Sequence, residues 1–383
     1  MLRLEQLKSK ITALGAHAVE KRQRRALEVE ELLTWLESGP EAASLRQRLQ
    51  EEEEETTAYA EPVEDGPLNR RVAVTGAPAR QSVLVAVDGS QIMPDRHAPV
   101  LYYLLQMGGL LFTYDGEAPR SQTAASLHYE DAELYDQEGQ VITHQLGMRR
   151  AVAELSFLAR LVAEVEQEAP RPILALTDGP LLWPYSGRSQ EEIDALLPAY
   201  FAALSRMREQ GGMPIGFVER PGGRPLVDLL RLTHPDPERT TEPQRLLLTD
   251  QVLMARFLEP GQRSPWFRRN SPLNQRHQRY GHPIWFCYLH VGEPGYPVIA
   301  RVEVPEWAAR QGEWVESMQR VLVHQSCVLG GHPYALARAH ELALVTLQDR
   351  QALDALLQRR LLEAGVVVHP SEKARQKSYL GRR

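Results

Sequence analysis

Residues 82–90 have the sequence Ser-Val-Leu-Val-Ala-Val-Asp-Gly-Ser, an apolar run that ends in an acidic residue, a glycine and a serine. Such a run predicts a strand buried on both faces, with a turn that begins at Asp-Gly. The pattern recurs at residues 172–180, Pro-Ile-Leu-Ala-Leu-Thr-Asp-Gly-Pro. Either Asp-Gly pair taken alone is better explained as a simple turn. Together they predict two aspartates, Asp88 and Asp178, at the carboxyl ends of two buried strands.

The segment between these strands supplies a third acidic candidate. Residues 97–114 and 126–136 predict further strands joined by short turns, and residues 145–167 predict an amphipathic helix. Glu154 lies in the apolar seam of that helix, where the spacing favours an apolar residue. A carboxylate in a packed seam is costly unless it is paired or bound to a cation. Glu154 is therefore a candidate cation ligand beside the two aspartates.

This order of three strands, a helix and a fourth strand resembles the opening of the ribonuclease-H-like fold. In that fold the fourth strand is parallel to the first, and acidic residues lie on the first strand, on the helix and at the end of the fourth strand. The chain is accordingly predicted to be an α/β protein, with a ribonuclease-H-like mixed sheet flanked by helices and an N-terminal helical arm.

Composition limits the class of protein further. The chain has 383 residues, of which 25% are charged and 43% apolar, as in a globular protein. Its net charge of −6 argues against indiscriminate coating of nucleic acid. No apolar run reaches the ~20 residues of a membrane span, and the polar N-terminus is unlike a secretory signal. The two cysteines, Cys287 and Cys327, cannot form a disulfide framework, and both are expected to be buried. These features predict a cytoplasmic protein with no membrane partner.

The distribution of positive charge excludes one class of ATPase. Lysine is absent between residues 22 and 372, and the chain has no GxxxxGK[ST] motif, so the P-loop and its phosphate-binding lysine are missing. We therefore expect this chain to bind no ATP. The positive charge of the core is carried by arginine, which contacts phosphate in a bidentate manner.

One arginine-rich segment is a candidate nucleic-acid contact. Residues 263–279 contain five arginines and no acid, together with aromatic side chains. Arginine interleaved with aromatic residues suits a nucleic-acid strand, because the guanidinium binds phosphate and the ring stacks on an unpaired base. When the segment is considered alone, it is at least as compatible with a basic surface loop that contacts nothing. When it is considered together with the two aspartates, the nucleic-acid interpretation is favoured. The predicted DNA-binding residues are Arg263, Trp266, Phe267, Arg268, Arg269 and Arg276.

The chain is predicted to divide into four parts. Residues 1–60 form a helical arm, which is either a solvated appendage or a dimerisation and docking element. Residues 61–82, rich in proline and glycine, form a linker or an irregular strand pair. Residues 83–365 form the main domain, and residues 366–383 form a basic tail. Within the main domain, residues 283–289 and 297–305 predict a hairpin, in which Glu303 is expected to face outward. A helix from about residue 333 carries His340, which alone is more often a packed helix histidine than a catalytic one.

Short motifs in a fixed order resemble the NurA nuclease family. They extend over about residues 83–345, and each is weak alone. The matching pieces are Val87-Asp88-Gly89-Ser90, residues 149–154, Thr177-Asp178-Gly179, residues 217–221, residues 258–264, residues 300–305 and residues 331–340.

The resemblance implies a DNA nuclease that depends on Mn²⁺ or Mg²⁺. Asp88, Glu154 and Asp178 correspond to the acidic residues of the family active site, and His340 corresponds to its C-terminal histidine, so these four are the predicted catalytic and metal-binding residues. Two hard cations held by oxygen ligands can activate water and stabilise the leaving oxygen in phosphodiester hydrolysis. A family tyrosine lies eight residues before the histidine. Here that position is His332, with Tyr334 as a nearby substitute, and both join the predicted DNA-binding residues.

The resemblance also implies partners. It predicts a toroidal homodimer that works with the hexameric HerA-type DNA-translocating ATPase on single-stranded and double-stranded DNA ends. The activities implied are 5′–3′ exonuclease and single-strand endonuclease, used to resect ends in recombinational repair. A catalytically passive adaptor that threads DNA for that ATPase is the alternative, although an adaptor needs no acid at position 154. An actin-like phosphotransferase is disfavoured, because the sequence lacks its further glycine-rich phosphate loops.

Overall fold

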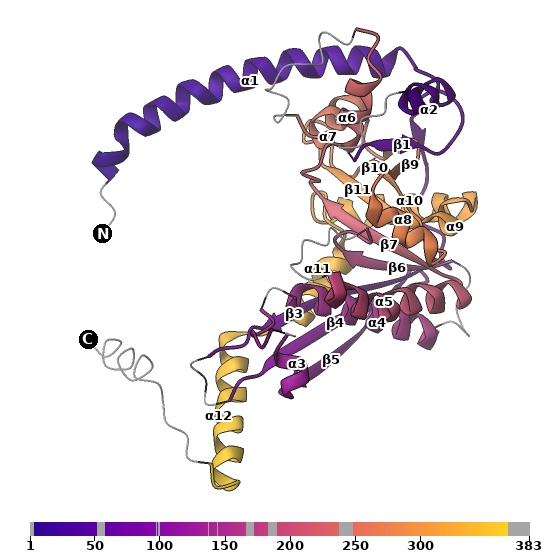
Figure 1. Ribbon diagram of the computed structural model, residues 1–383. Helices are drawn as coiled ribbons and strands as arrows, with labels where there is room; N and C mark the ends of the chain where they lie inside the picture. The colour runs from indigo at the N-terminus through magenta and orange to yellow at the C-terminus, as the bar shows by residue number, and fades with distance from the viewer. Residues whose placement is uncertain are drawn as a thin grey trace. The chain divides into compact units, whose positions relative to one another are not determined.

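The computed structural model describes residues 4–51, 58–96, 98, 100–136, 138–143, 145–165, 172–182, 190–236 and 248–366. The chain forms two compact units (Figure 1). The first unit comprises Met1–Ala79, Gly179–Pro184 and Pro214–Tyr334; the second comprises Arg80–Asp178, Tyr185–Met213 and Ala335–Arg383. The predicted basic tail, residues 366–383, lies outside the described residues apart from its first.

The second unit is built on four strands. β3 (Val83–Ile92), β4 (Tyr103–Thr113) and β5 (Arg120–His128) form an antiparallel meander. Helix α4 (Leu146–Val165) follows, and β6 (Ile173–Asp178) then returns parallel to β3. The predicted order of three strands, a helix and a fourth strand is thus confirmed. Residues 131–134 differ from the prediction, because they form the short helix α3 and not a strand.

The predicted turn at Asp88-Gly89 is wrong. β3 continues through both residues to Ile92, because β4 keeps pairing with it from Val83 to Ile92. The parallel pairing with β6 stops earlier, at Val87 opposite Thr177. Asp88 therefore lies within a strand, at the point where one of its two neighbouring strands ends.

Two adjacent glycines in β4 allow helices to approach both faces of this sheet. A methyl group at position 109 would lie 2.5 Å from the Leu161 side chain of α4. A methyl group at position 108 would collide with the backbone of α11 (Tyr334–Ala343). Because neighbouring residues of a strand point to opposite faces, α4 and α11 cover opposite sides of β4. Helix α5 (Gln190–Glu209) packs against α4, and α12 (Leu347–Glu363) follows α11.

The first unit contains a second set of strands. Its order is β1 (Ala60–Pro62), β9 (Phe267–Arg269), β10 (Ile284–His290), β11 (Ile299–Pro305) and β7 (Gly212–Glu219), and β2 (Val72–Ala73) pairs with β8 (Gln262–Arg263). The predicted hairpin is confirmed as β10 and β11. In the segment predicted to be a linker or an irregular strand pair, residues 61–82, the chain forms short strands: β1 pairs with β9 and β2 pairs with β8, and not with each other.

The first unit also contains helices. They are η1 (Leu4–Leu7), α1 (Lys8–Glu37), α2 (Ala42–Glu51), α6 (Pro225–Leu232), α7 (Asp250–Phe257), α8 (Pro272–Arg279), α9 (Glu306–Ala309) and α10 (Gly312–Cys327). Only the second half of α1 enters the hydrophobic core, through Val29, Leu32 and Leu36. Ile11 and Leu14 in its first half are exposed. Cys327 at the end of α10 is also exposed, contrary to expectation.

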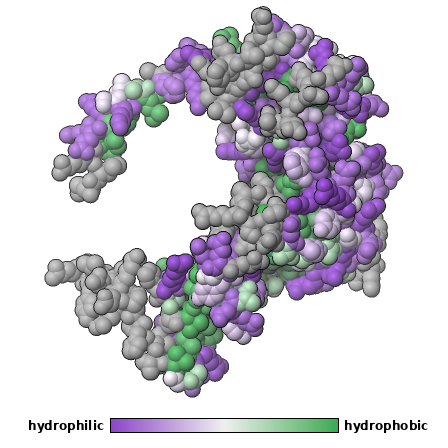
Figure 2. Space-filling model, viewed as in Figure 1, coloured by the Kyte–Doolittle hydropathy of each residue, from purple (hydrophilic) through white to green (hydrophobic). Residues whose placement is uncertain are grey.

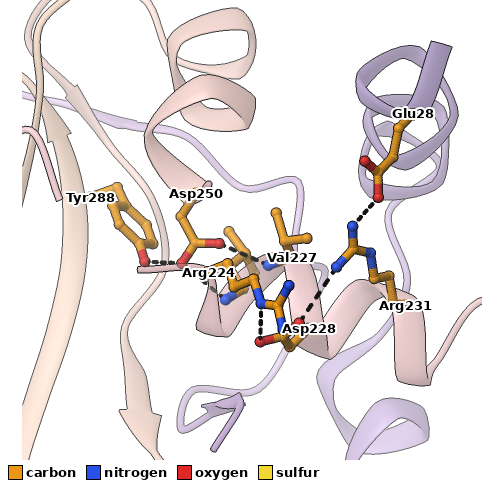
Figure 3. Close-up of polar contacts among 8 residues, drawn as sticks. Glu28, Arg224, Val227, Asp228, Arg231, Asp250 and Tyr288 are labelled. Carbon is orange, nitrogen blue, oxygen red and sulfur yellow. Dashed lines mark hydrogen bonds and ion pairs between the residues drawn. The ribbon is translucent and has the colours of Figure 1, made fainter. Parts of the chain in front are cut away.

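Asp250 fixes the start of α6 from within the core (Figure 3). Its carboxylate accepts hydrogen bonds from the backbone amides of Leu226 at 3.0 Å and Val227 at 2.8 Å, and from the Tyr288 hydroxyl. Burial raises the pKa of Asp250 to about 6, although these three donors favour its charged form. Such a carboxylate satisfies the free amides of a helix N-terminus in place of water.

A second set of ion pairs joins α1 to α6. The Arg231 guanidinium contacts Glu28 of α1 and lies 3.6 Å from Asp228 (Figure 3). Arg231 is 7% exposed, so its charge is held by these two carboxylates more than by water. The second half of α1 is therefore part of the first unit.

Apolar side chains also remain on the surface. Leu347, Leu356 and Leu362 of α12 are 73%, 53% and 62% exposed, and Figure 2 shows apolar residues gathered along this helix.

Among the helices of the described residues, none combines the length and apolar character needed to cross a membrane.

Candidate active site

Asp88 and Asp178 lie on neighbouring parallel strands, each one residue beyond the last pair, Val87 and Thr177. Parallel strands are about 4.8 Å apart, and residues in register point to the same face of the sheet. The side chain of Asp88 is 13% exposed, whereas Asp178, at the end of β6, is open to solvent. The structure thus brings the two predicted aspartates side by side. Gly179 follows with a φ of 104°, a left-handed conformation that favours glycine.

Glu154 approaches the same place from α4, and Gly89 makes room for it. A methyl group at position 89 would lie 2.6 Å from Glu154 Oε1, so any larger residue there would force this carboxylate to shift from its place against β3. Glu154 is 7% exposed. Burial raises the pKa of Glu154 to about 8; the Asp88 and Asp178 carboxylates raise it further, while the Arg150 guanidinium and the Gly89 amide oppose the shift. Arg150 Nε lies 3.1 Å from Oε1.

His340 is brought to Asp88 by helix α11. Its Nδ1 lies 2.6 Å from Asp88 Oδ2. Asp88 Oδ1 accepts a hydrogen bond of 2.8 Å from the Gly89 amide, and the Ser90 hydroxyl donates to the carbonyl of Ala343 at the end of α11. The pairing of His340 with Asp88 follows from the close packing of α11 on Gly108. All four predicted catalytic residues therefore belong to the second unit.

The donor set fits a hard divalent cation in its chemistry. Three carboxylates and one imidazole offer mainly oxygen ligands, which Mg²⁺ and Mn²⁺ prefer. Glu154 Oε1 is buried and has no hydrogen-bond partner, although Arg150 is near it. A buried carboxylate oxygen in that state, close to two more carboxylates, is stabilised by a cation. Within the described part of the chain, no three acidic, histidine or cysteine side chains already converge to hold a metal ion.

Three of the predicted DNA-binding residues are wrongly assigned. Trp266 and Phe267 are each 1% exposed, and Arg263 is 8% exposed. Neither ring can stack on a base, because strand β9 and its surroundings bury both. The Arg263 guanidinium lies over the Trp266 ring at 5.5 Å and donates to the Ser264 carbonyl. The aromatic residues of this segment are core residues, which the local sequence cannot distinguish from a stacking surface.

The remaining predicted DNA-binding residues are partly exposed. Arg268 is paired with Glu61 of β1 at 2.6 Å. Arg269, Arg276, His332 and Tyr334 retain part of their surface. All of these residues belong to the first unit. A role for them in DNA binding stays a prediction.

Trp266→Ala is expected to destabilise the protein by about 3–5 kcal/mol, the cost of removing a buried indole. Urea unfolding of the variant measures this loss. The matched change Arg268→Ala, close by in the chain but partly exposed, is expected to cost far less because surface ion pairs contribute about 0–1 kcal/mol. A Trp266→Ala variant of unchanged stability would contradict the assignment of Trp266 to the core.

Glu303 is a supporting residue that the sequence pattern misplaced. It is 2% exposed and not outward-facing. Its carboxylate accepts hydrogen bonds from the Leu182 amide at 2.7 Å and from Arg301 Nε at 2.8 Å. Glu303 therefore holds the backbone at Leu182, shortly after Asp178 in the chain. Alternation with the valines on either side suggested a solvent-facing position, but both faces of β11 are covered.

The chain matches the family model of the NurA domain over residues 82–345, and no curated protein matches it. Similar solved structures include a crystal structure of NurA, 12% identical with a TM-score of 0.41, covering 75% of this chain and 90% of that chain. A crystal structure of NurA with manganese is 11% identical, with a TM-score of 0.41 and coverages of 75% and 91%. A crystal structure of NurA bound to dAMP and manganese is 13% identical, with a TM-score of 0.40 and coverages of 93% and 98%. Because the family model spans well over half of the chain, this protein belongs to the NurA family.

Proposed function

We propose that this protein is a metal-dependent DNA nuclease whose active site contains Asp88, Glu154, Asp178 and His340. The observation that carries the proposal is the buried carboxylate of Glu154, placed by Gly89 beside two aspartates of neighbouring strands. Membership of the NurA family supports the same activity. A purely structural role would not require an acid at a position whose burial opposes its charge.

Asp88, Glu154 and Asp178 would hold Mn²⁺ or Mg²⁺, with His340 as a further ligand or as a proton donor. Bound there, a pair of such cations supplies the positive charge that activates water and neutralises the leaving oxygen. The protein's part is to fix the carboxylates. Gly89 admits Glu154 to the site, the Gly89 amide orients Asp88, and Glu303 anchors the backbone after Asp178.

His340 is suited to proton transfer as well as to ligation. Its Nδ1 faces Asp88 Oδ2, so Nε2 is the nitrogen that can give a proton to the departing oxygen of the substrate. The ring is 59% exposed, which leaves it accessible to a nucleic-acid strand. Asp88 would keep the orientation of the imidazole through this hydrogen bond.

We further propose the finer features that the family resemblance implies. These are a ribonuclease-H-like core, 5′–3′ exonuclease and single-strand endonuclease activity, and resection of DNA ends in recombinational repair. The partners would be a second copy of the chain and a hexameric HerA-type ATPase, which would supply the ATP-driven translocation. The exposed first half of α1 is the proposed arm for dimerisation or docking.

Digestion of end-labelled linear DNA tests the proposal. Purified protein is incubated with Mn²⁺, Mg²⁺ or EDTA, and wild type is compared with Asp88→Asn. Cleavage is expected with a divalent metal only, and Asp88→Asn should lower the rate by about 1,000-fold or more, because it removes a ligand needed to stabilise transition-state charge. Asp115→Asn, which changes an exposed aspartate just after β4, is the matched control and should cleave like wild type.

The passive adaptor gives a different result. It predicts no metal-dependent cleavage by the wild type, either alone or with the ATPase partner present, and equal DNA retention by wild type and Asp88→Asn. Cleavage that persists in Asp88→Asn would contradict the proposed active site.

A further inference from the structure

We propose that Arg220 and His332, held together by Glu219, form a phosphate-binding site for the backbone of the nucleic-acid substrate. This inference rests on the proposed nuclease function and adds a binding residue, Arg220, to it. The three residues come from the end of β7 and the segment before α11, so chain folding and not local sequence brings them together.

The Glu219 carboxylate joins the two basic side chains with its two oxygens. Arg220 Nε lies 3.4 Å from Oε1, and His332 Nδ1 lies 3.2 Å from Oε2. The carboxylate thus holds a guanidinium and an imidazole together at one place on the surface. The Arg220 side chain is 58% exposed, so a ligand can reach it.

Arg220 adopts a backbone conformation that L-amino acids avoid. Its φ of 47° is the only positive value at a non-glycine residue within the described ranges. Proline follows at position 221, and a residue before proline is ordinarily confined to extended backbone. Glycine or asparagine would fit this position with less strain. Strain retained at one exposed arginine points to a function for its side chain.

The backbone before His332 is also constrained. Gly330 and Gly331 before it have φ values of 65° and 122°, and a methyl group at position 331 would come within 2.8 Å of Val298. The imidazole then rests edge-on against the buried Phe217 ring, with centroids 6.1 Å apart at 84°. Imidazole and carboxylate are thus positioned by packing before any ligand binds.

Strand β7, which leads to Glu219 and Arg220, also holds another segment of the first unit. The Phe217 carbonyl accepts a hydrogen bond of 2.8 Å from Gly179, the residue that follows Asp178. Phe217 and Glu219 lie on the same face of β7, two residues apart. A phosphate bound by Arg220 and His332 would therefore be held at the end of β7, the strand whose Phe217 carbonyl accepts the hydrogen bond from Gly179.

The chemistry favours phosphate over a base as the ligand. A guanidinium binds two phosphate oxygens in a bidentate manner, and a protonated imidazole adds a second charged donor. His332, fixed edge-on by Phe217 and bonded through Nδ1, has its Nε2 left for such a contact. The imidazole at this position would thus contact the sugar-phosphate backbone in a sequence-independent way.

Fluorescence anisotropy with labelled single-stranded DNA in EDTA tests the inference, because no cleavage occurs and binding is measured alone. Arg220→Gly is the main variant, since glycine accepts the left-handed backbone while the guanidinium is removed. We expect a roughly tenfold weaker Kd at moderate salt. The slope of log K against log salt should fall by about 0.7, because one arginine no longer neutralises a phosphate. Arg220→Lys should restore part of the affinity and part of the salt slope. His332→Gln should also weaken DNA binding.

Controls separate this inference from folding and from the proposed function. Arg310→Ala removes another exposed arginine of the first unit, paired with Glu306, and should leave both Kd and slope unchanged. Urea unfolding should show Arg220→Gly to be at least as stable as wild type. If the wild type binds DNA and Arg220→Gly binds it with the same Kd and the same salt slope, the proposed phosphate site is wrong, while the nuclease function stands. Failure of the wild type to bind DNA would instead contradict the nuclease function on which the site rests.

Discussion

Glu154→Gln is expected to abolish DNA cleavage and, at the same time, to stabilise the metal-free protein at alkaline pH. The two effects have one cause. Burial against β3 raises the pKa of Glu154 from 4.5 to about 8, so the folded protein resists placing a charge there. A bound cation requires that charge, whereas the metal-free fold is destabilised by it. Glutamine keeps the shape and removes the ionisation.

The pH dependence follows from proton linkage. Between pH 4.5 and 8 the folded wild type binds more protons at Glu154 than the unfolded chain does. Its stability therefore falls as pH rises through this window, by at most about 5 kcal/mol for a shift of that size. Glu154→Gln lacks this titration. The gain in melting temperature of the variant over wild type should be near zero at acidic pH and largest above pH 8.

Thermal unfolding with and without Mn²⁺ measures both effects. Mn²⁺ should raise the melting temperature of wild type, because it binds only the folded state, and should raise that of Glu154→Gln much less. Glu164→Gln, on the same helix with its side chain 44% exposed, is the matched control and should behave like wild type in both assays. A Glu154→Gln protein that still cleaves DNA, or that is less stable than wild type above pH 8, would contradict the role assigned to Glu154.

Gly108→Ala should separate His340 from Asp88. The added methyl group would collide with the Ala339 carbonyl and lie 2.5 Å from the Ala343 amide, so α11 must move away from β4. Since α11 carries His340, this movement would break the 2.6 Å hydrogen bond between Nδ1 and Asp88 Oδ2. We expect kcat to fall about 100-fold, the lower range for loss of a general acid, with a smaller effect on KM.

A double variant distinguishes displacement of the helix from general damage. Gly108→Ala and His340→Ala act through the same hydrogen bond, so the double variant should be hardly slower than either single one. Gly312→Ala, at a glycine with open space around it, is the control and should be neutral. Fully multiplicative losses in the double variant would show that Gly108 acts on activity by some route other than His340.

The strands that carry the site were predictable because their signals are local. A continuous run of buried residues followed by Asp-Gly marked β3 and β6, and one acid in an apolar helical seam marked Glu154. The continuation of β3 past Asp88 was not predictable in the same way. It depends on pairing with β4, a partner fixed by the fold, which overrides the turn preference of Asp-Gly.

Residues whose role depends on distant contacts could not be assigned from the sequence. Trp266 was predicted to contact DNA but is buried in the core. Glu303 was predicted to face solvent but is buried and accepts a hydrogen bond from the Leu182 amide. Gly108 and Gly109 did carry a signal. Paired glycines within an apolar strand indicate close approach of other backbone, and here that backbone belongs to α11 on one face, while α4 side chains occupy the other.

Anomalous X-ray scattering from crystals soaked in Mn²⁺ tests the proposed metal site most directly, because it locates the metal independently of activity. We predict an anomalous difference peak among the carboxylates of Asp88, Glu154 and Asp178, with oxygen ligands at about 2.2 Å, and the absence of this peak in Asp88→Asn. If DNA cleavage requires manganese but the anomalous peak lies elsewhere on the protein, the assignment of these three residues to the active site is contradicted.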